Sequence, residues 1–170
     1  MPSKLDFQII RAKFWIMKSL DNLSPKCFFV AWVFAWVAAI FIPSAAIAVL
    51  GLSPLAIEND VFGGIVAVAD EVAPAAKLSF AVIFACLLLV ARAARPTGGA
   101  ILDSILGAVS ILVVLALLPS DWSRGFGIGL SGTRFEALPT AIYVIGGLCS
   151  GLVFSISEAR CMRRRARATA

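Results

Sequence analysis

The sequence predicts an all-α integral membrane protein with four transmembrane helices and an N-terminal amphipathic helix at the membrane interface. Hydrophobic residues make up 61% of its 170 residues and charged residues only 15%, whereas soluble domains are roughly half apolar and a quarter charged. Four stretches are long and apolar enough to cross a hydrocarbon layer of about 30 Å at about 1.5 Å of rise per helical residue. Because four crossings use nearly the whole chain, we expect one membrane domain over residues 1–170.

Residues 1–26 are expected to form a cytoplasmic amphipathic segment. Between Phe7 and Met17, apolar residues recur at spacings of three and four, which is the pattern of a helix with one apolar face. The opposite face carries basic residues that would point toward lipid phosphates, namely Lys4, Arg11 and Lys18. The segment therefore fits a helix lying in the headgroup region, and packing against the protein's own spans is the alternative.

The first predicted span, residues 27–52, contains no charged residue. Pro43 lacks a backbone N–H and should loosen the helix near its far third. An aromatic stripe at helical spacing consists of Phe29, Trp32 and Trp36. We interpret this stripe as a packing or lipid-facing surface, and a surface for a lipid, quinone or pigment is the alternative.

Residues 53–76 combine four acids with apolar residues at helical spacing between Pro54 and Pro74. A short helix on the outer membrane face would satisfy this pattern. The pair Gly63-Gly64 weakens such a helix, so a broken or re-entrant segment is the alternative.

The second and third spans are predicted at about 75–94 and 100–118, and Asp103 is the one acid close to being embedded in them. An intramembrane carboxylate is a candidate for handling protons or ions. We favour a structural role, because Asp103 lies in the first turn of its helix, where the helix dipole stabilises an anion. Arg92 or Arg95 is close enough in the sequence to pair with it.

The fourth span, about 138–156, carries a strip of small residues at four-residue spacing, formed by Gly147, Gly151 and Ser155. Such a strip lets another helix backbone approach closely, and close contact is what drives helix association in lipid. The partner helix is expected either in another subunit or in a span of the same chain.

The C-terminal segment, residues 157–170, is a basic tail in which Arg163, Arg164 and Arg165 are candidate ligands of anionic lipid headgroups. If both termini and the loop 92–99 are cytoplasmic, twelve Lys and Arg residues lie inside and three outside, which satisfies the positive-inside rule. We therefore expect a bacterial inner-membrane protein with both ends in the cytoplasm. Because the basic residues flank apolar spans, lipid rather than nucleic acid is the expected partner.

The chain contains no histidine, which removes the usual haem ligand, the commonest metal ligand and the commonest general base. Its four cysteines include no C-x-x-C pair, so we interpret all of them as structural and expect neither a zinc site nor a redox motif. No catalytic, cofactor-binding or metal-binding residue is predicted, and we do not expect an enzyme.

These features predict a non-catalytic accessory or structural subunit of a larger membrane protein complex. It would act through helix–helix and lipid contacts, with other membrane subunits or further copies of itself as partners. The alternative is a small transporter or pore-forming oligomer, which needs polar residues along a path. The polar residues within or near the spans are few, namely Ser79, Asp103, Ser104, Ser110, Thr140, Tyr143 and Ser150.

Overall fold

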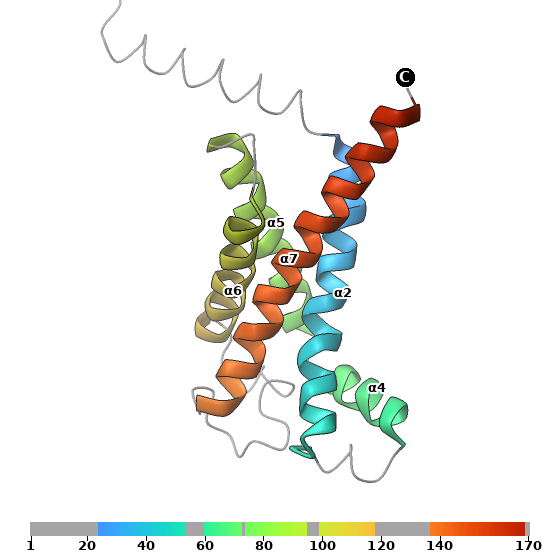
Figure 1. The fold of residues 1–170 in the computed structure, drawn as a ribbon. Coiled ribbons are helices and arrows are strands. Elements are labelled where there is room, and N and C mark those ends of the chain that lie inside the picture. The colour runs from blue at the N-terminus through green and yellow to red at the C-terminus, as the bar shows by residue number, and fades with distance from the viewer. Residues whose placement is uncertain (1–23, 54–59, 73, 95–98, 118–136, 169–170) are drawn as a thin grey trace, which may run out of the picture.

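The computed structural model describes residues 24–53, 60–72, 74–94, 99–117 and 137–168. They form the helices α2 (Pro25–Val49), α4 (Val61–Glu71), α5 (Pro74–Ala94), α6 (Ala100–Leu117) and α7 (Ala137–Ala168) (Figure 1). Four of these helices, α2, α5, α6 and α7, are long and apolar enough to cross a membrane. The prediction of an all-helical chain with four candidate spans is thus confirmed for this part of the chain. The predicted amphipathic helix lies outside the described residues.

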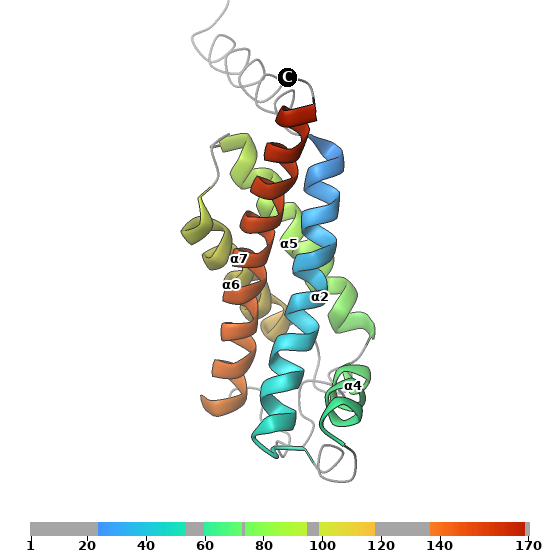
Figure 2. The same cartoon turned by 45° about the vertical axis from the view of Figure 1, so that its right-hand side comes forward.

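The four long helices form a bundle in which successive spans run in opposite directions (Figures 1 and 2). Helix α7 packs along both α2 and α6, while α5 contacts α6 and α2. One end of the bundle holds the start of α2, the end of α5, the start of α6 and the end of α7. We call it the arginine end, because α7 ends in a run of arginines there. Helix α4 lies beside the opposite end of α2.

Helix α2 has clear start and stop signals. Pro25 occupies its first turn, where its missing N–H is not needed. Gly51 follows the last turn with φ +62°, and the N–H of Leu52 donates to the Ile47 carbonyl over 3.0 Å. This is the glycine-terminated helix end in which orphan carbonyls are satisfied. Pro43 lies inside the helix without ending it.

A row of alanines on α2 explains how closely α7 approaches it. Ala31, Ala35 and Ala39 lie four residues apart and are buried. Small residues at this spacing let two helices pack with little separation between their backbones. The hydroxyl of Ser150 on α7 donates to the Ala35 carbonyl over 2.7 Å, so a hydrogen bond reinforces the contact.

Helix α4 runs unbroken through the Gly63-Gly64 pair. Asp60 caps its first turn by accepting a hydrogen bond from the Gly63 N–H over 3.2 Å. Its buried side chains, Val68 among them, join the core of the bundle. The short helix predicted between the first two long helices is therefore present, and the alternative of a broken helix does not hold over Val61–Glu71.

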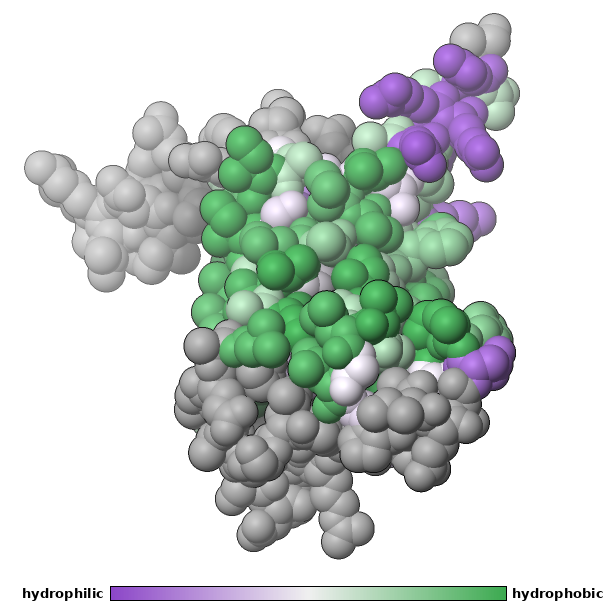
Figure 3. All heavy atoms as spheres, turned by 60° about the horizontal axis from the view of Figure 1, so that its bottom comes forward, coloured by the Kyte–Doolittle hydropathy of each residue, from purple (hydrophilic) through white to green (hydrophobic). Residues whose placement is uncertain are grey.

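The outward faces of the long helices are apolar. Phe34 is 58% exposed, Leu78 60% and Ile101 80%, and Figure 3 shows apolar side chains covering much of one face of the bundle while hydrophilic ones gather at its upper edge. In water such a surface would promote aggregation, whereas in lipid it is the expected exterior. The surface therefore fits the composition of the spans.

The observed helix bounds match the predicted spans within three residues, except at the end of the last one. The predicted span 138–156 is part of α7, which continues as a helix to Ala168. The basic tail predicted from residue 157 is therefore helical over most of its length, and its turns extend past the ends of the other spans (Figures 1 and 2).

Candidate functional site

Three ionisable side chains meet inside the arginine end of the bundle. Arg92 on α5 donates to both carboxylate oxygens of Asp103 on α6, each over 2.9 Å, and to Glu158 on α7 over 2.7 Å. The Arg92 and Asp103 side chains are only 3% and 0% exposed, and that of Glu158 is 20% exposed. One cation is thus shared by two carboxylates from different helices, and we call this group the charge cluster.

Local sequence explains two of the three positions. Asp103 lies in the first turn of α6 and Arg92 in the last turn of α5, where the helix dipoles favour an anion and a cation respectively. The expectation that an arginine at the end of the second span pairs with Asp103 names the right residue in Arg92. Arg95, the other candidate, lies outside the described residues.

Glu158 is the member of the cluster that sequence reasoning missed. We assigned it to the basic tail, where a single acid among arginines has no evident role. The signal was present, because Glu158 is the only acid after Glu136 and lies two residues past the end of the predicted apolar span 138–156. A carboxylate so close to the end of an apolar span is expected to pair with a cation, which a neighbouring helix can supply.

A cluster of three aromatic rings packs against the charge cluster. The Arg92 guanidinium carbon lies 5.5 Å from the centre of the Phe154 ring, a distance at which a cation is attracted to the ring face. Phe154 is fully buried, and it meets Phe28 of α2 and Phe84 of α5 edge to face at 5.3 and 6.1 Å between ring centres. Together the charges and rings connect all four long helices.

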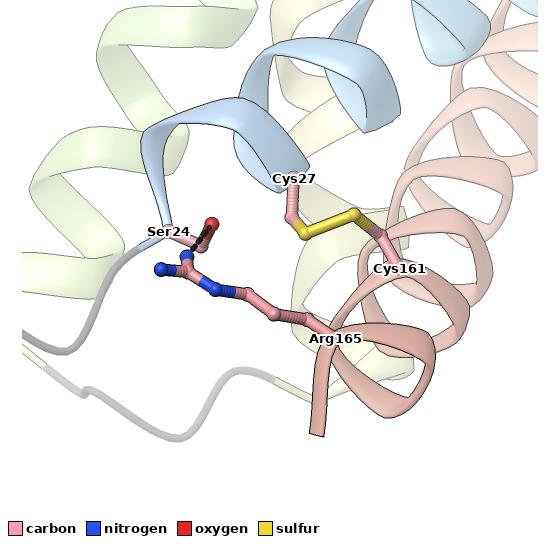
Figure 4. Close-up of a disulfide and its surroundings, with 4 residues drawn as sticks. All are labelled: Ser24, Cys27, Cys161 and Arg165. Carbon is pink, nitrogen blue, oxygen red and sulfur yellow. Dashed lines mark hydrogen bonds between the residues drawn. A yellow bond between two sulfur atoms is a disulfide. The ribbon is translucent and has the colours of Figure 1, made fainter. Parts of the chain in front are cut away.

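Beyond the charge cluster, a covalent bond joins the first and last spans. Cys27 on α2 and Cys161 on α7 form a disulfide with their Cα atoms 5.5 Å apart, across a sequence separation of 134 residues (Figure 4). Next to it, Arg165 donates a hydrogen bond to the Ser24 hydroxyl over 2.7 Å. This pairing was not predicted from the sequence, where all four cysteines were interpreted as structural. The remaining cysteines, Cys86 and Cys149, are free thiols.

The small-residue strip of α7 faces α6 of the same chain. A Cβ placed on Gly147 would lie 2.6 Å from the Gly107 carbonyl oxygen, and one on Gly151 would lie 2.5 Å from the Ser104 Cα. Both distances are shorter than real contacts allow, so the two backbones touch here. The third member, Ser155, is half-buried. Of the two partners expected for the strip, the structure places a span of the same chain against its glycines.

The aromatic stripe of the first span also serves packing. The indole N–H groups of Trp32 and Trp36 donate to the carbonyls of Ala81 and Lys77 on α5, each over 3.0 Å. Phe29, the third member, is 60% exposed. The stripe thus fastens α2 to α5 by two hydrogen bonds and leaves one ring on the outside.

A small pocket lies near the other end of the bundle, between α2, α5, α6 and α7. Its lining is almost wholly apolar and includes Ile40, Phe80, Ile111 and Tyr143. The space open to the centre of a water-sized molecule is about 20 Å³, which is room for about one water molecule. A quinone or pigment does not fit in this pocket.

The candidate headgroup ligands divide into three groups. Lys4, Arg11 and Lys18 lie outside the described residues. Arg163 and Arg164 are exposed on α7. Arg165 is exposed as well, but it also donates a hydrogen bond to the Ser24 hydroxyl of α2's N-terminal end.

Among the described residues, no three His, Cys, Asp or Glu side chains gather in a group that could hold a metal ion. The charge cluster itself can hold three helix ends together, since each carboxylate accepts from the same buried guanidinium.

No protein-family model, curated protein or solved structure matches the chain.

Proposed function

We propose that the protein is a non-catalytic subunit of a larger membrane protein complex and acts through helix–helix and lipid contacts. The main support is that the polar side chains of the spans bond inside the bundle. Asp103 is paired with Arg92, and Ser150 is bonded to the backbone of α2. The outward faces of the described spans are left mostly apolar, and such faces contact lipid or other membrane helices.

The same bonds weigh against the alternative of a transporter. A transport path needs polar groups that can exchange partners with a substrate. Asp103 is fully buried with both oxygens bonded to Arg92, and the Ser110 hydroxyl donates to the Leu106 carbonyl of its own helix over 2.7 Å. These groups are already satisfied within the chain.

The surface we propose for contact with another subunit is a row of exposed side chains on α2. Val30, Phe34, Val37 and Phe41 follow one face of the helix at spacings of three and four, and each is between 42% and 58% exposed. We call this row the α2 ridge. It projects large side chains, as helix pairs that interlock ridges into grooves require.

Purification of the tagged full-length chain in mild detergent tests this proposal. We expect stoichiometric partner proteins to co-purify, and we expect Phe34→Ala with Phe41→Ala to reduce their recovery. Leu112→Ala on α6 is the matched control, because Leu112 is similarly exposed, at 43%. A chain that always purifies alone, with the double variant indistinguishable from the original, would refute the assignment.

We further propose that the protein lies in a bacterial inner membrane with both ends in the cytoplasm. The support is the distribution of Lys and Arg, with twelve on one side and three on the other. In a cysteine-free background, Ile128→Cys should react with an impermeant thiol reagent in intact cells and Arg163→Cys should not. Labelling in the opposite sense would overturn the orientation.

A further inference from the structure

The last turns of α7 have two unlike faces. One face is fixed to the start of α2, because Cys161 forms the disulfide with Cys27 and Arg165 bonds Ser24 (Figure 4). Cys161 and Arg165 are four residues apart and therefore lie on the same side of the helix. The end of α7 is thus held at two successive turns.

The opposite face carries a row of arginines that we call the arginine stripe. Its members recur at spacings of three, one and three residues and are exposed, namely Arg160, Arg163, Arg164 and Arg167. At about 100° per residue, they fall within an arc of about 100°, centred about 130° away from the middle of the fixed face. No ion pair found among the described residues involves the stripe.

The position of the stripe along α7 matches a layer of phosphates. From Leu138 to Arg160 the helix rises about 33 Å, close to the roughly 30 Å of a hydrocarbon layer. The stripe covers about the next 10 Å, where the headgroups of one leaflet lie. Arginine presents a planar fork of donors that fits phosphate oxygens in pairs. Its charge, depth and geometry therefore all favour the same ligand.

We propose that the arginine stripe is a docking surface for the phosphates of anionic membrane lipids, held in place by the attachment of the opposite face to α2. This inference rests on the proposed function as a membrane subunit and specifies its lipid partner. It differs from a general attraction between a basic tail and lipid, because it includes Arg160 and Arg167 and excludes Arg165, which is engaged with Ser24.

Two neighbouring arginines provide a matched pair of variants. Arg164→Gln and Arg165→Gln remove the same charge at adjacent positions, one on the stripe and one on the fixed face. The purified full chain is titrated with phosphatidylglycerol, or with phosphatidylcholine of the same acyl chains, and bound lipid is counted by native mass spectrometry. We expect the original chain to prefer phosphatidylglycerol and Arg164→Gln to weaken its binding about fivefold, the equivalent of about 1 kcal/mol per arginine.

Arg165→Gln should change the phosphatidylglycerol affinity by less than about twofold, since its side chain is directed toward the start of α2, where it bonds Ser24, and away from the stripe. Equal losses in the two variants would overturn the proposal, because net charge alone would then explain binding. Equal affinities of the original chain for phosphatidylglycerol and phosphatidylcholine would also overturn the proposal. The arginine stripe would then be a candidate binding surface for an acidic protein. Both failures are distinct from failure of the subunit proposal, because co-purification of partner proteins is measured separately.

Discussion

Neutralising Asp103 should destabilise the protein by about 3 kcal/mol. Its side chain is fully buried and is bonded to Arg92 through two contacts of 2.9 Å. Removing one partner of a buried ion pair costs about 3 to 5 kcal/mol, because the other charge is left without compensation in a medium of low dielectric. In Asp103→Asn, however, Arg92 keeps Glu158 at 2.7 Å, so we expect the lower end of that range.

Asp103→Asn should stabilise the protein, instead of destabilising it, when Arg92 is absent. In Arg92→Met, two carboxylates lose their shared cation, and this variant should be less stable than Asp103→Asn. Adding Asp103→Asn to Arg92→Met then removes an uncompensated buried anion. The double variant should therefore be more stable than Arg92→Met alone, which corresponds to a coupling energy of about 3 kcal/mol or more between the two positions.

Unfolding in mixed micelles with increasing sodium dodecyl sulfate, followed by far-ultraviolet circular dichroism, measures these differences. Glu158→Gln serves as the comparison, because its carboxylate is 20% exposed and its loss should cost only about 1 to 2 kcal/mol. If Asp103→Asn costs the same with and without Arg92, the pair is not coupled and our reasoning fails. If Asp103→Asn is as stable as the original chain, Asp103 has no structural role, and the alternative that it handles protons or ions is favoured.

Three further predictions concern contacts between helices. Gly151→Leu should destabilise the monomer by about 3 kcal/mol, the upper end of the usual cost of overpacking, because even an added Cβ overlaps the α6 backbone. Gly99→Leu, whose Cβ would meet nothing within 4 Å, should cost only about 1 kcal/mol, because glycine is preferred to leucine at the residue that precedes a helix. Cys161→Ser should lower the free energy of unfolding by about 2 to 4 kcal/mol, and dithiothreitol should have the same effect on the original chain and none on the variant. Trp36→Phe should cost about 1 kcal/mol in the same unfolding assay, because the Lys77 carbonyl loses its indole donor; a variant as stable as the original would show that this hydrogen bond contributes nothing.

The sequence alone was sufficient to place the four long apolar helices, because hydropathy is a local property. Helix α6 was expected at 100–118 and runs from Ala100 to Leu117. The end of α7 could not be placed in this way, since the apolar run stops near Ile156 while Ala and Arg continue to favour a helix. Hydropathy therefore predicts where a chain leaves the apolar layer, and helix propensity decides where its helix ends.

Pairings between distant residues were harder to predict. Asp103 and Arg92 are only eleven residues apart in the sequence, on helices that follow one another along the chain, so their contact could be expected from the sequence. Glu158 and the Cys27–Cys161 bond depend on how α7 crosses the bundle, which in turn depends on glycines that meet across α6 and α7. A single sequence contains these residues without stating which helices become neighbours.

The Cys27–Cys161 bond acquires a different meaning in the proposed orientation. It lies beside the arginines of α7, on the side where cellular glutathione keeps thiols reduced. In that compartment the bond would be reversible, and two thiol molecules would convert it to two free cysteines and one external disulfide. The start of α2 and the end of α7 would then alternate between a covalent joint and one held by the Arg165–Ser24 hydrogen bond and neighbouring side chains. The fraction of chains that carry the disulfide, measured after rapid acid quenching of cells, would report the balance between thiols and disulfides on the cytoplasmic side of the membrane.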